Sequence, residues 1–162
     1  MHFTSTQKRM LTICLSIYTS AYFCRLNLAA ALESIASALS LSIPAAGFLQ
    51  TVFALVYAMG QLVNGSMVDK LNPARYVLVG IVGSAVSNML MGASANYPML
   101  IGACALNAAF QSMLWTPIMR LIALYFRKSD ERERVNVTLA LTLVIGHFGA
   151  WAISGFMADI FS

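Results

Sequence analysis

The sequence predicts an all-α membrane protein with five transmembrane helices. Of its 162 residues, 59% are hydrophobic and 10% are charged, whereas a soluble domain carries about 25% charged residues. The mean hydropathy of +0.75 also indicates a membrane protein. Five apolar segments each approach or exceed the roughly 20 residues that cross a bilayer as a helix. We therefore expect the lipid bilayer to surround most of the chain.

The boundaries of the five predicted helices follow from the apolar runs and from local start signals. Ser42-Ile43-Pro44, before the second run, is typical of a helix start. Pro117 lies within the fourth run, where we expect it to bend the helix. The predicted helices cover about residues 10–36, 45–68, 76–94, 98–126 and 135–157.

The basic residues predict the orientation of the chain in the membrane. Connections 33–43 and 95–97 contain no Lys or Arg, whereas the N-terminus and the other two connections are basic. Because cytoplasmic loops carry the excess of positive charge, we expect a cytoplasmic N-terminus and an external C-terminus. The net charge of +4 is spread over these segments and does not indicate a nucleic-acid partner. The basic residues concerned are Lys8, Arg9, Lys70, Arg75, Arg127, Lys128, Arg132 and Arg134.

Small residues recur every four positions on the third and fifth predicted helices, where they let neighbouring backbones approach closely within lipid. We interpret Asn88 and Asn107 as interhelical hydrogen-bonding residues. The three cysteines lack metal-ligand spacing, so we expect no metal and no cofactor. The small-residue faces consist of Gly80, Ser84, Asn88 and Gly92, and of Gly146, Ala150 and Ser154.

Arg25 is the only charged residue between Met10 and Leu32. It lies roughly 22 Å along the helix axis from Met10. A charge at such depth costs about 2.5–3.5 kcal/mol on insertion scales and usually faces water or a partner. No carboxylate falls at a similar depth, and a guanidinium suits a carboxylate or phosphate. We therefore expect Arg25 to contact a small anionic solute, with structural hydrogen bonding as the alternative.

Further polar residues accompany Arg25 in the predicted helices. Tyr22 lies close to it on one helix face, and Tyr57 and Gln61 share a face of the second helix. His147 lies near the middle of the fifth helix, where it adds a hydrogen-bond donor or a charge that changes with pH.

Arg120 differs from Arg25 because it lies close to the cytoplasmic end of its predicted helix. It is about 9 Å from that end, so its side chain can reach the interface. Alternatively, it can form an ion pair with a loop carboxylate such as Asp69. We expect a structural or gating role for Arg120.

Three segments resemble a known family. The sequence GSMVDK at residues 65–70, followed by Arg75, resembles the GxxxD(R/K) loop signature of the major facilitator superfamily. Within it, YFCRLN at residues 22–27 resembles the Y-x-x-R-x-N of helix one in the organophosphate:phosphate antiporters. Residues 115–120 and the basic loop ending at Arg134 resemble that family's helix four and the loop after it.

The resemblance implies five helices of a six-helix N-terminal bundle, in a carrier of glycerol-3-phosphate or hexose phosphates that works by alternating access. Substrate is then held between two halves of the protein, and the C-terminal half is the missing partner. His147 falls where the family has a substrate-site histidine. One departure concerns Gln61, where family members can have a lysine, and the loss of a cation weakens the case for a phosphate ester.

The expected site therefore has two parts. The substrate-binding residues are Arg25, Tyr22, Tyr57, Gln61 and His147. The residues of the cytoplasmic gate and loop signature are Gly65, Asp69, Lys70, Arg75 and Arg120.

Two alternatives to a transporter stay open. The first is a membrane sensor, because the resembled family includes sensors of sugar phosphates with the same fold. The second is a non-functional truncated fragment, because the sixth helix and the second half of the family's fold are absent from this sequence. An enzyme is disfavoured because no paired acids or His-rich motif lie at one interface, so no catalytic residue is expected. We expect location in a bacterial inner membrane.

Overall fold

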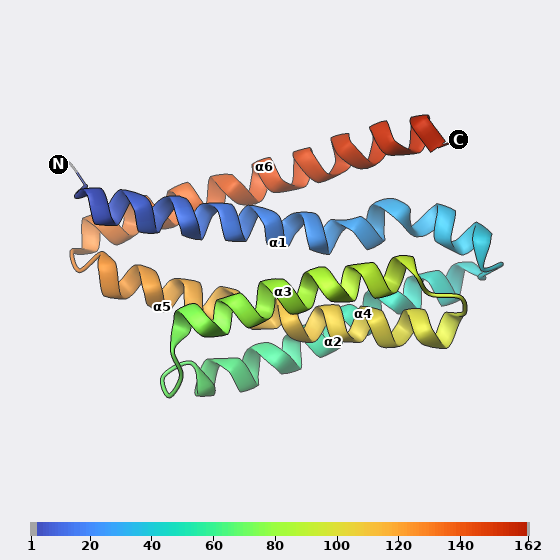
Figure 1. Cartoon of the computed structure of the whole chain (residues 1–162), viewed down its shortest axis with the longest axis horizontal. Coiled ribbons are helices and arrows are strands. Elements are labelled where there is room, and N and C mark those ends of the chain that lie inside the picture. Colours follow the sequence, from blue (N-terminus) through green and yellow to red (C-terminus); the bar gives the residue numbers. More distant parts are fainter. Residues whose placement is uncertain (1–2, 162) are drawn as a thin grey trace.

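The computed structural model describes residues 3–161, which form six helices laid along one long axis (Figure 1). Within this range, the side chains at positions 27, 30, 31, 142, 143, 147 and 150–161 are not described. In chain order the helices are α1 (Ser5–Ala38), α2 (Ile43–Met67), α3 (Pro73–Gly92), α4 (Tyr97–Ser112), α5 (Trp115–Tyr125) and α6 (Ser129–Phe161).

Three helices begin with a polar cap and a proline. The Ser42 side chain accepts a hydrogen bond from the backbone N–H of Ala45, and Asn96 accepts one from Met99. Asn72 caps α3 in the same way. Each cap supplies an acceptor for N–H groups that have no partner within the helix. The helix start predicted before the second apolar run is therefore confirmed.

The segment predicted as one bent helix over 98–126 is divided into α4 and α5 by a break at Met113 and Leu114. Pro117 lacks the N–H that would bond to the carbonyl of Met113, and its ring crowds that carbonyl. The N–H groups of Met113 and Leu114 bond to the carbonyls three residues before them. The helix therefore tightens, ends and restarts, instead of bending as one continuous element.

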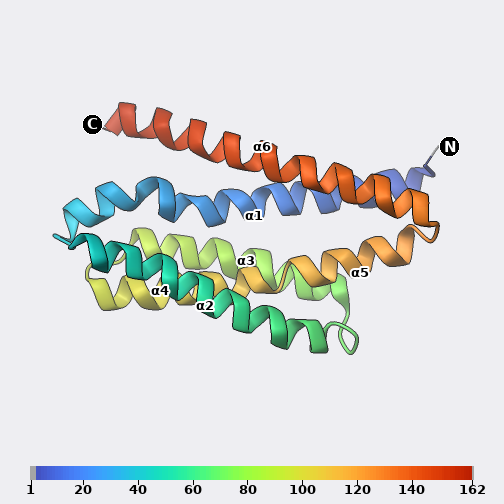
Figure 2. The same cartoon turned by 180° about the vertical axis from the view of Figure 1, so that it is seen from behind.

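α1 lies between α6 and the other four helices (Figure 1 and Figure 2). α6 packs along α1 and runs in the same direction. On the other side of α1, α4 packs against both α2 and α3. This arrangement brings the middle of α1 close to α4, although about 80 residues separate them in sequence.

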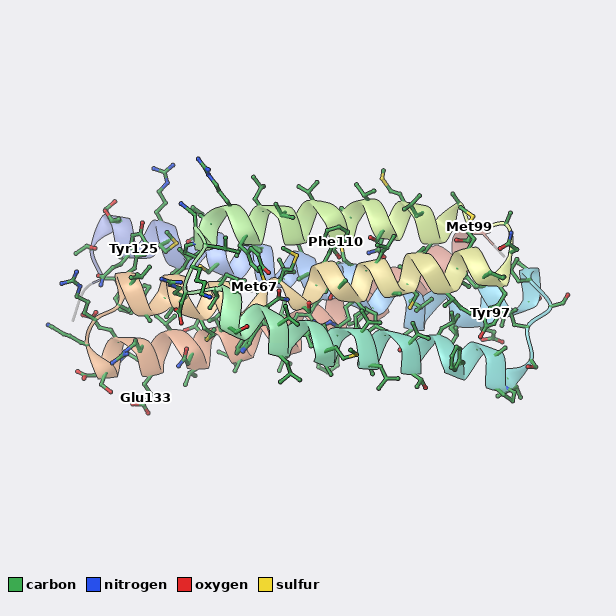
Figure 3. The ribbon with its side chains drawn as sticks, turned by 90° about the horizontal axis from the view of Figure 1, so that it is seen from below. Met67, Tyr97, Met99, Phe110, Tyr125 and Glu133 are labelled. Atoms are coloured by element: carbon green, nitrogen blue, oxygen red, sulfur yellow. The ribbon has the colours of Figure 1, made fainter. Side chains whose placement is uncertain are left out.

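The segments that carry the basic residues lie at one end of the bundle. The N-terminus, the α2–α3 connection and the α5–α6 connection are on the left in Figure 1. Tyr125 and Glu133 mark the same end in Figure 3, and Tyr97 and Met99 mark the opposite one. The segments that are basic in the sequence therefore lie together at one end of the structure. The side of the membrane that each end occupies stays a prediction.

The outer faces of the helices are apolar, whereas polar side chains are buried. Leu55, Met59 and Leu62 of α2 are 60%, 67% and 79% exposed, but Ser84 and Asn107 are 0% and 1% exposed. This distribution suits a hydrocarbon surround, because polar groups there need partners within the protein. By length and composition, three stretches of the described chain can cross a membrane: Ile43–Met67, Pro73–Gly92 and Tyr97–Tyr125.

The predicted small-residue face of α3 contacts α4 through Ser84 and Asn88. Ser84 donates a hydrogen bond to the side-chain oxygen of Asn107 (2.7 Å), and Asn88 donates to the same oxygen (3.4 Å). The interhelical role predicted for both asparagines is confirmed. Gly80 is buried in this contact, but Gly92 is exposed with open space around its Cα. The packing role predicted for Gly92 is wrong, because it is the last residue of α3.

α6 approaches α1 closely at Gly146. A Cβ atom on Gly146 would lie 2.9 Å from the Cβ of Tyr22, so a larger residue would separate the helices. Gly146 therefore packs as the sequence predicted. The side chains of Ala150 and Ser154 lie outside the described residues.

Gly80→Ala should destabilise the fold, and Gly102→Ala should not. A Cβ on Gly80 would lie 2.7 Å from a methyl of Leu114 and 3.0 Å from the carbonyl oxygen of Phe110, whereas nothing lies within 4 Å of a Cβ on Gly102. Overpacking costs about 1–3 kcal/mol, and alanine is the better helix former at both sites. Thermal unfolding in detergent measures the difference, and equal unfolding temperatures would contradict the α3–α4 packing.

Candidate functional site

Arg25 lies half-buried on α1 among three aromatic rings. Its guanidinium carbon is 4.6 Å from the centre of the Tyr57 ring, 5.3 Å from Tyr22 and 5.9 Å from Phe53. Rings within about 6 Å attract a cation through their negative faces. α1 and α2 together therefore supply an aromatic surround for this charge.

The Nε of Arg25 donates a hydrogen bond to Oε1 of Gln111 on α4, at 2.9 Å. Gln111 is completely buried. Its Nε2 donates to the carbonyl of Ala21 (3.3 Å) and lies close to the side-chain oxygens of Ser84 (3.2 Å) and Asn107 (3.4 Å). The amide therefore connects α1, α3 and α4 at the level of Arg25.

Gln111 was not among the expected site residues. The sequence places it one turn after Asn107 on a polar face of the fourth segment. That spacing alone does not reveal which helix the face meets, and the contact with Arg25 depends on the packing of α4 against α1.

Arg25 makes no ion pair among the side chains that the structure describes. The ion pair found there joins Arg120 to Asp69. The terminal Nη groups of Arg25 also make no hydrogen bond to any described residue. Within the described part of the chain, no carboxylate therefore compensates the guanidinium, and its two Nη groups keep four N–H donors for a ligand or water.

On α2, Gln61 and Tyr57 form one hydrogen-bonded unit with α5. The Gln61 amide donates to the Tyr57 hydroxyl (2.8 Å) and accepts from the Thr116 hydroxyl (3.2 Å). Both ends of the Gln61 side chain are therefore engaged within the protein. The unit adjoins Arg25 through the Tyr57 ring.

Tyr22 is buried beside Arg25, and its ring packs edge-on against Tyr18 with centroids 5.1 Å apart. The two hydroxyls lie 3.3 Å from one another. The backbone of α6 reaches this region at Gly146. The side chain of His147, the next residue, lies outside the described residues.

The expected gate residues are brought together only in part. Arg120 Nη1 lies 3.2 Å from Oδ1 of Asp69 and donates to the backbone carbonyl of Val68. Val68 is the C-cap residue that follows α2, so Arg120 places a cation at a helix C-terminus. The anticipated ion pair with Asp69 is thus present. The remaining members, Gly65, Lys70 and Arg75, are exposed.

A buried polar cluster near this end was not expected. The Asn64 amide donates to the Ser112 hydroxyl (2.8 Å) and accepts from the Tyr76 hydroxyl. It joins α2, α3 and α4 beside the ends of α2 and α4. In the described part of the chain, His, Cys, Asp and Glu form no group of three that is able to hold a metal ion.

Comparison with known proteins bears on this arrangement. The family model described as Major Facilitator Superfamily matches residues 13–162. The chain is 26% identical over 113 residues to the probable hexose phosphate transport protein of Chlamydia trachomatis serovar D, covering 70% of this chain and 25% of that protein. It is 28% identical over 121 residues to membrane sensor protein UhpC of Escherichia coli strain K12, covering 75% and 27%. The chain thus spans about a quarter of the length of these curated relatives. No solved structure matches significantly.

Arg120→Met should lower the unfolding temperature more than Asp69→Asn. Asp69 is 81% exposed, so its ion pair contributes at most about 1 kcal/mol. Methionine additionally removes the donor to the Val68 carbonyl, a charge-assisted bond worth about 1.5–3 kcal/mol. Thermal unfolding in detergent is the measurement, with the exposed Lys70→Met as control. Equal losses from both variants would show that the Val68 contact contributes nothing.

Proposed function

Because the chain belongs to the major facilitator superfamily, we propose that it forms the N-terminal part of a secondary carrier for a small organic anion. The proposal is based on Arg25. It is a fixed cation deep in α1, and no described carboxylate compensates it. Because a charge in a membrane-spanning helix is costly, it is retained where a ligand or function requires it.

The guanidinium is arranged to bind an oxyanion. Its central carbon lies over the Tyr57 and Tyr22 rings, and Nε is engaged by Gln111. The remaining Nη edge is the part that grips a carboxylate or phosphate with two parallel hydrogen bonds. Tyr22, Tyr57, Gln61 and His147 line the same substrate site in this proposal.

The proposed substrate class is an organophosphate, exchanged for phosphate. Support comes from the relative described as a probable hexose phosphate transport protein and from residues 22–27 around Arg25. Gln61 supplies amide groups where a lysine would add a second cation, and both ends of that amide already bond to Tyr57 and Thr116. The anion would therefore receive its further positive charge from the other half of the carrier.

Transport would proceed by alternating access, without chemistry on the substrate. The six-helix C-terminal half is the proposed partner, and substrate binds between the two halves. Arg120 connects α5 to the end of α2 through Val68 and Asp69. We propose that this contact, with Gly65 of α2, Lys70 of the α2–α3 connection and Arg75 of α3, stabilises the cytoplasmic gate.

A sensor of the same fold is the second candidate function. It is favoured by the 28% identity to membrane sensor protein UhpC. A sensor would bind the anion through Arg25 without moving it across the membrane. Reconstituted full-length protein that binds a labelled hexose phosphate but gives no saturable uptake would support the sensor and contradict the carrier.

Members of this superfamily are integral membrane proteins, and we propose the bacterial inner membrane with the N-terminus in the cytoplasm. A cysteine introduced at Asp130 should then be inaccessible to an impermeant thiol reagent added to intact cells, whereas one at Ala95 should react. Both positions are exposed. The three native cysteines are first replaced by alanine. Labelling of position 130 from outside would reverse the proposed orientation.

Arg25→Lys should weaken anion binding far more than Arg120→Lys in the full-length protein. Lysine keeps the charge but loses the planar two-point grip on an oxyanion, so we expect about tenfold weaker binding or more at Arg25. Arg120 contacts the C-terminal end of α2, and its replacement should change transport rate more than equilibrium affinity. Calorimetry with a hexose phosphate and with inorganic phosphate measures the binding affinity of both variants. Near-normal affinity in folded Arg25→Lys would remove the main argument for an anionic substrate.

A further inference from the structure

We propose that Gln111 is a positioning residue for Arg25. It holds Nε of the guanidinium and thereby directs the two Nη groups toward the anion. This inference rests on the proposed function, because it assumes that Arg25 binds the substrate. Gln111 is 0% exposed, so it acts through Arg25 and not by touching the ligand.

The orientation of the Gln111 amide is determined by unambiguous neighbours. Arg25 Nε is only a donor, so the atom 2.9 Å from it has to be the amide oxygen. The Ala21 carbonyl is only an acceptor, so the atom 3.3 Å from it has to be the amide nitrogen. Turning the amide by half a rotation would set donor against donor and acceptor against acceptor. Gln111 therefore presents one fixed acceptor to Arg25.

Engagement of Nε limits how Arg25 can grip an oxyanion. A guanidinium forms two parallel hydrogen bonds either from Nε and one Nη or from both Nη groups. Gln111 occupies the first edge, so the second edge is the one left for a ligand. The Tyr57 and Tyr22 rings lie within 4.6 Å and 5.3 Å of the guanidinium carbon and restrict its movement further. The result is a cation whose free edge is held in advance of binding.

Asn107 provides the comparison that separates positioning from packing. It is also a buried amide on α4, one turn before Gln111, and it bonds to Ser84 and to the Cys24 carbonyl. Among the described residues Asn107 makes no hydrogen bond to Arg25. Its oxygen lies 3.4 Å from Nε2 of Gln111, and its other bonds join α4 to α1 and α3. Loss of the Gln111 amide would leave the Ser84–Asn107 bond in place.

The test uses the full-length protein in lipid nanodiscs, with a labelled hexose phosphate and inorganic phosphate as probes. Gln111→Leu should weaken binding of both probes about tenfold, the effect of one lost charge-assisted hydrogen bond. Asn107→Leu should lower thermal stability at least as much, yet leave affinity within about threefold. If Gln111→Leu fails to fold, Gln111→Asn serves instead, because it keeps an amide but withdraws it from Arg25.

A double-mutant cycle provides the readout that a merely structural role would not change. If Gln111 acts through Arg25, adding Gln111→Leu to Arg25→Lys should weaken binding by less than about twofold more. Additive losses, or equal affinity losses in Gln111→Leu and Asn107→Leu, would overturn the proposal. If Arg25→Lys leaves no measurable binding, the affinities of Gln111→Leu and Asn107→Leu are compared instead, and a larger loss in Gln111→Leu supports the positioning role.

Failure of this inference is distinguishable from failure of the proposed function. Weak binding in Arg25→Lys with normal binding in both Gln111 variants would overturn the positioning role alone. Normal binding in Arg25→Lys, or no binding of either probe by the unmodified protein, would overturn the anion site and the positioning role together.

Discussion

The hydrogen bond between Arg25 and Gln111 is the interaction on which the arrangement of the candidate site depends. A guanidinium inside an apolar bundle needs acceptors from the protein, since lipid offers none. Gln111 provides one, and the other end of its amide reaches the Ala21 carbonyl and Ser84. The charge on α1 is thereby linked through one amide to both α3 and α4. The small residues of α3 permit the close approach that this arrangement requires.

The break between α4 and α5 lies between two contacts of the candidate site. Gln111, before the break, holds Arg25, and Thr116, after it, bonds to Gln61. Pro117 causes the break by removing one backbone hydrogen bond. Residues from two separately oriented helices therefore meet α1 and α2 at the same level. A continuous helix would place them on one rigid axis, with less freedom to satisfy both partners.

Arg25 and Arg120 occupy different physical settings. Arg120 lies near solvent at the end of α2, where a helix C-terminus and Asp69 both attract its charge. Arg25 has aromatic faces and one neutral amide, which leave its charge available. The same side chain therefore suits a structural contact in one place and anion binding in the other. The difference arises from what surrounds each guanidinium, not from the residue type.

The sequence by itself determined the apolar helical segments, the start of α2 at Ser42, the uneven distribution of basic charge and the unusual place of Arg25 within an apolar run. These depend on local rules: apolar length, N-cap chemistry, proline and loop charge. Only the tertiary structure decided that Gln111, 86 residues away, is the partner of Arg25, that Gln61 is occupied by Tyr57 and Thr116, and that Gly92 is outside the helix contact. Such pairings depend on how each helix is rotated and where it crosses its neighbours, and periodicity along one helix does not contain that information.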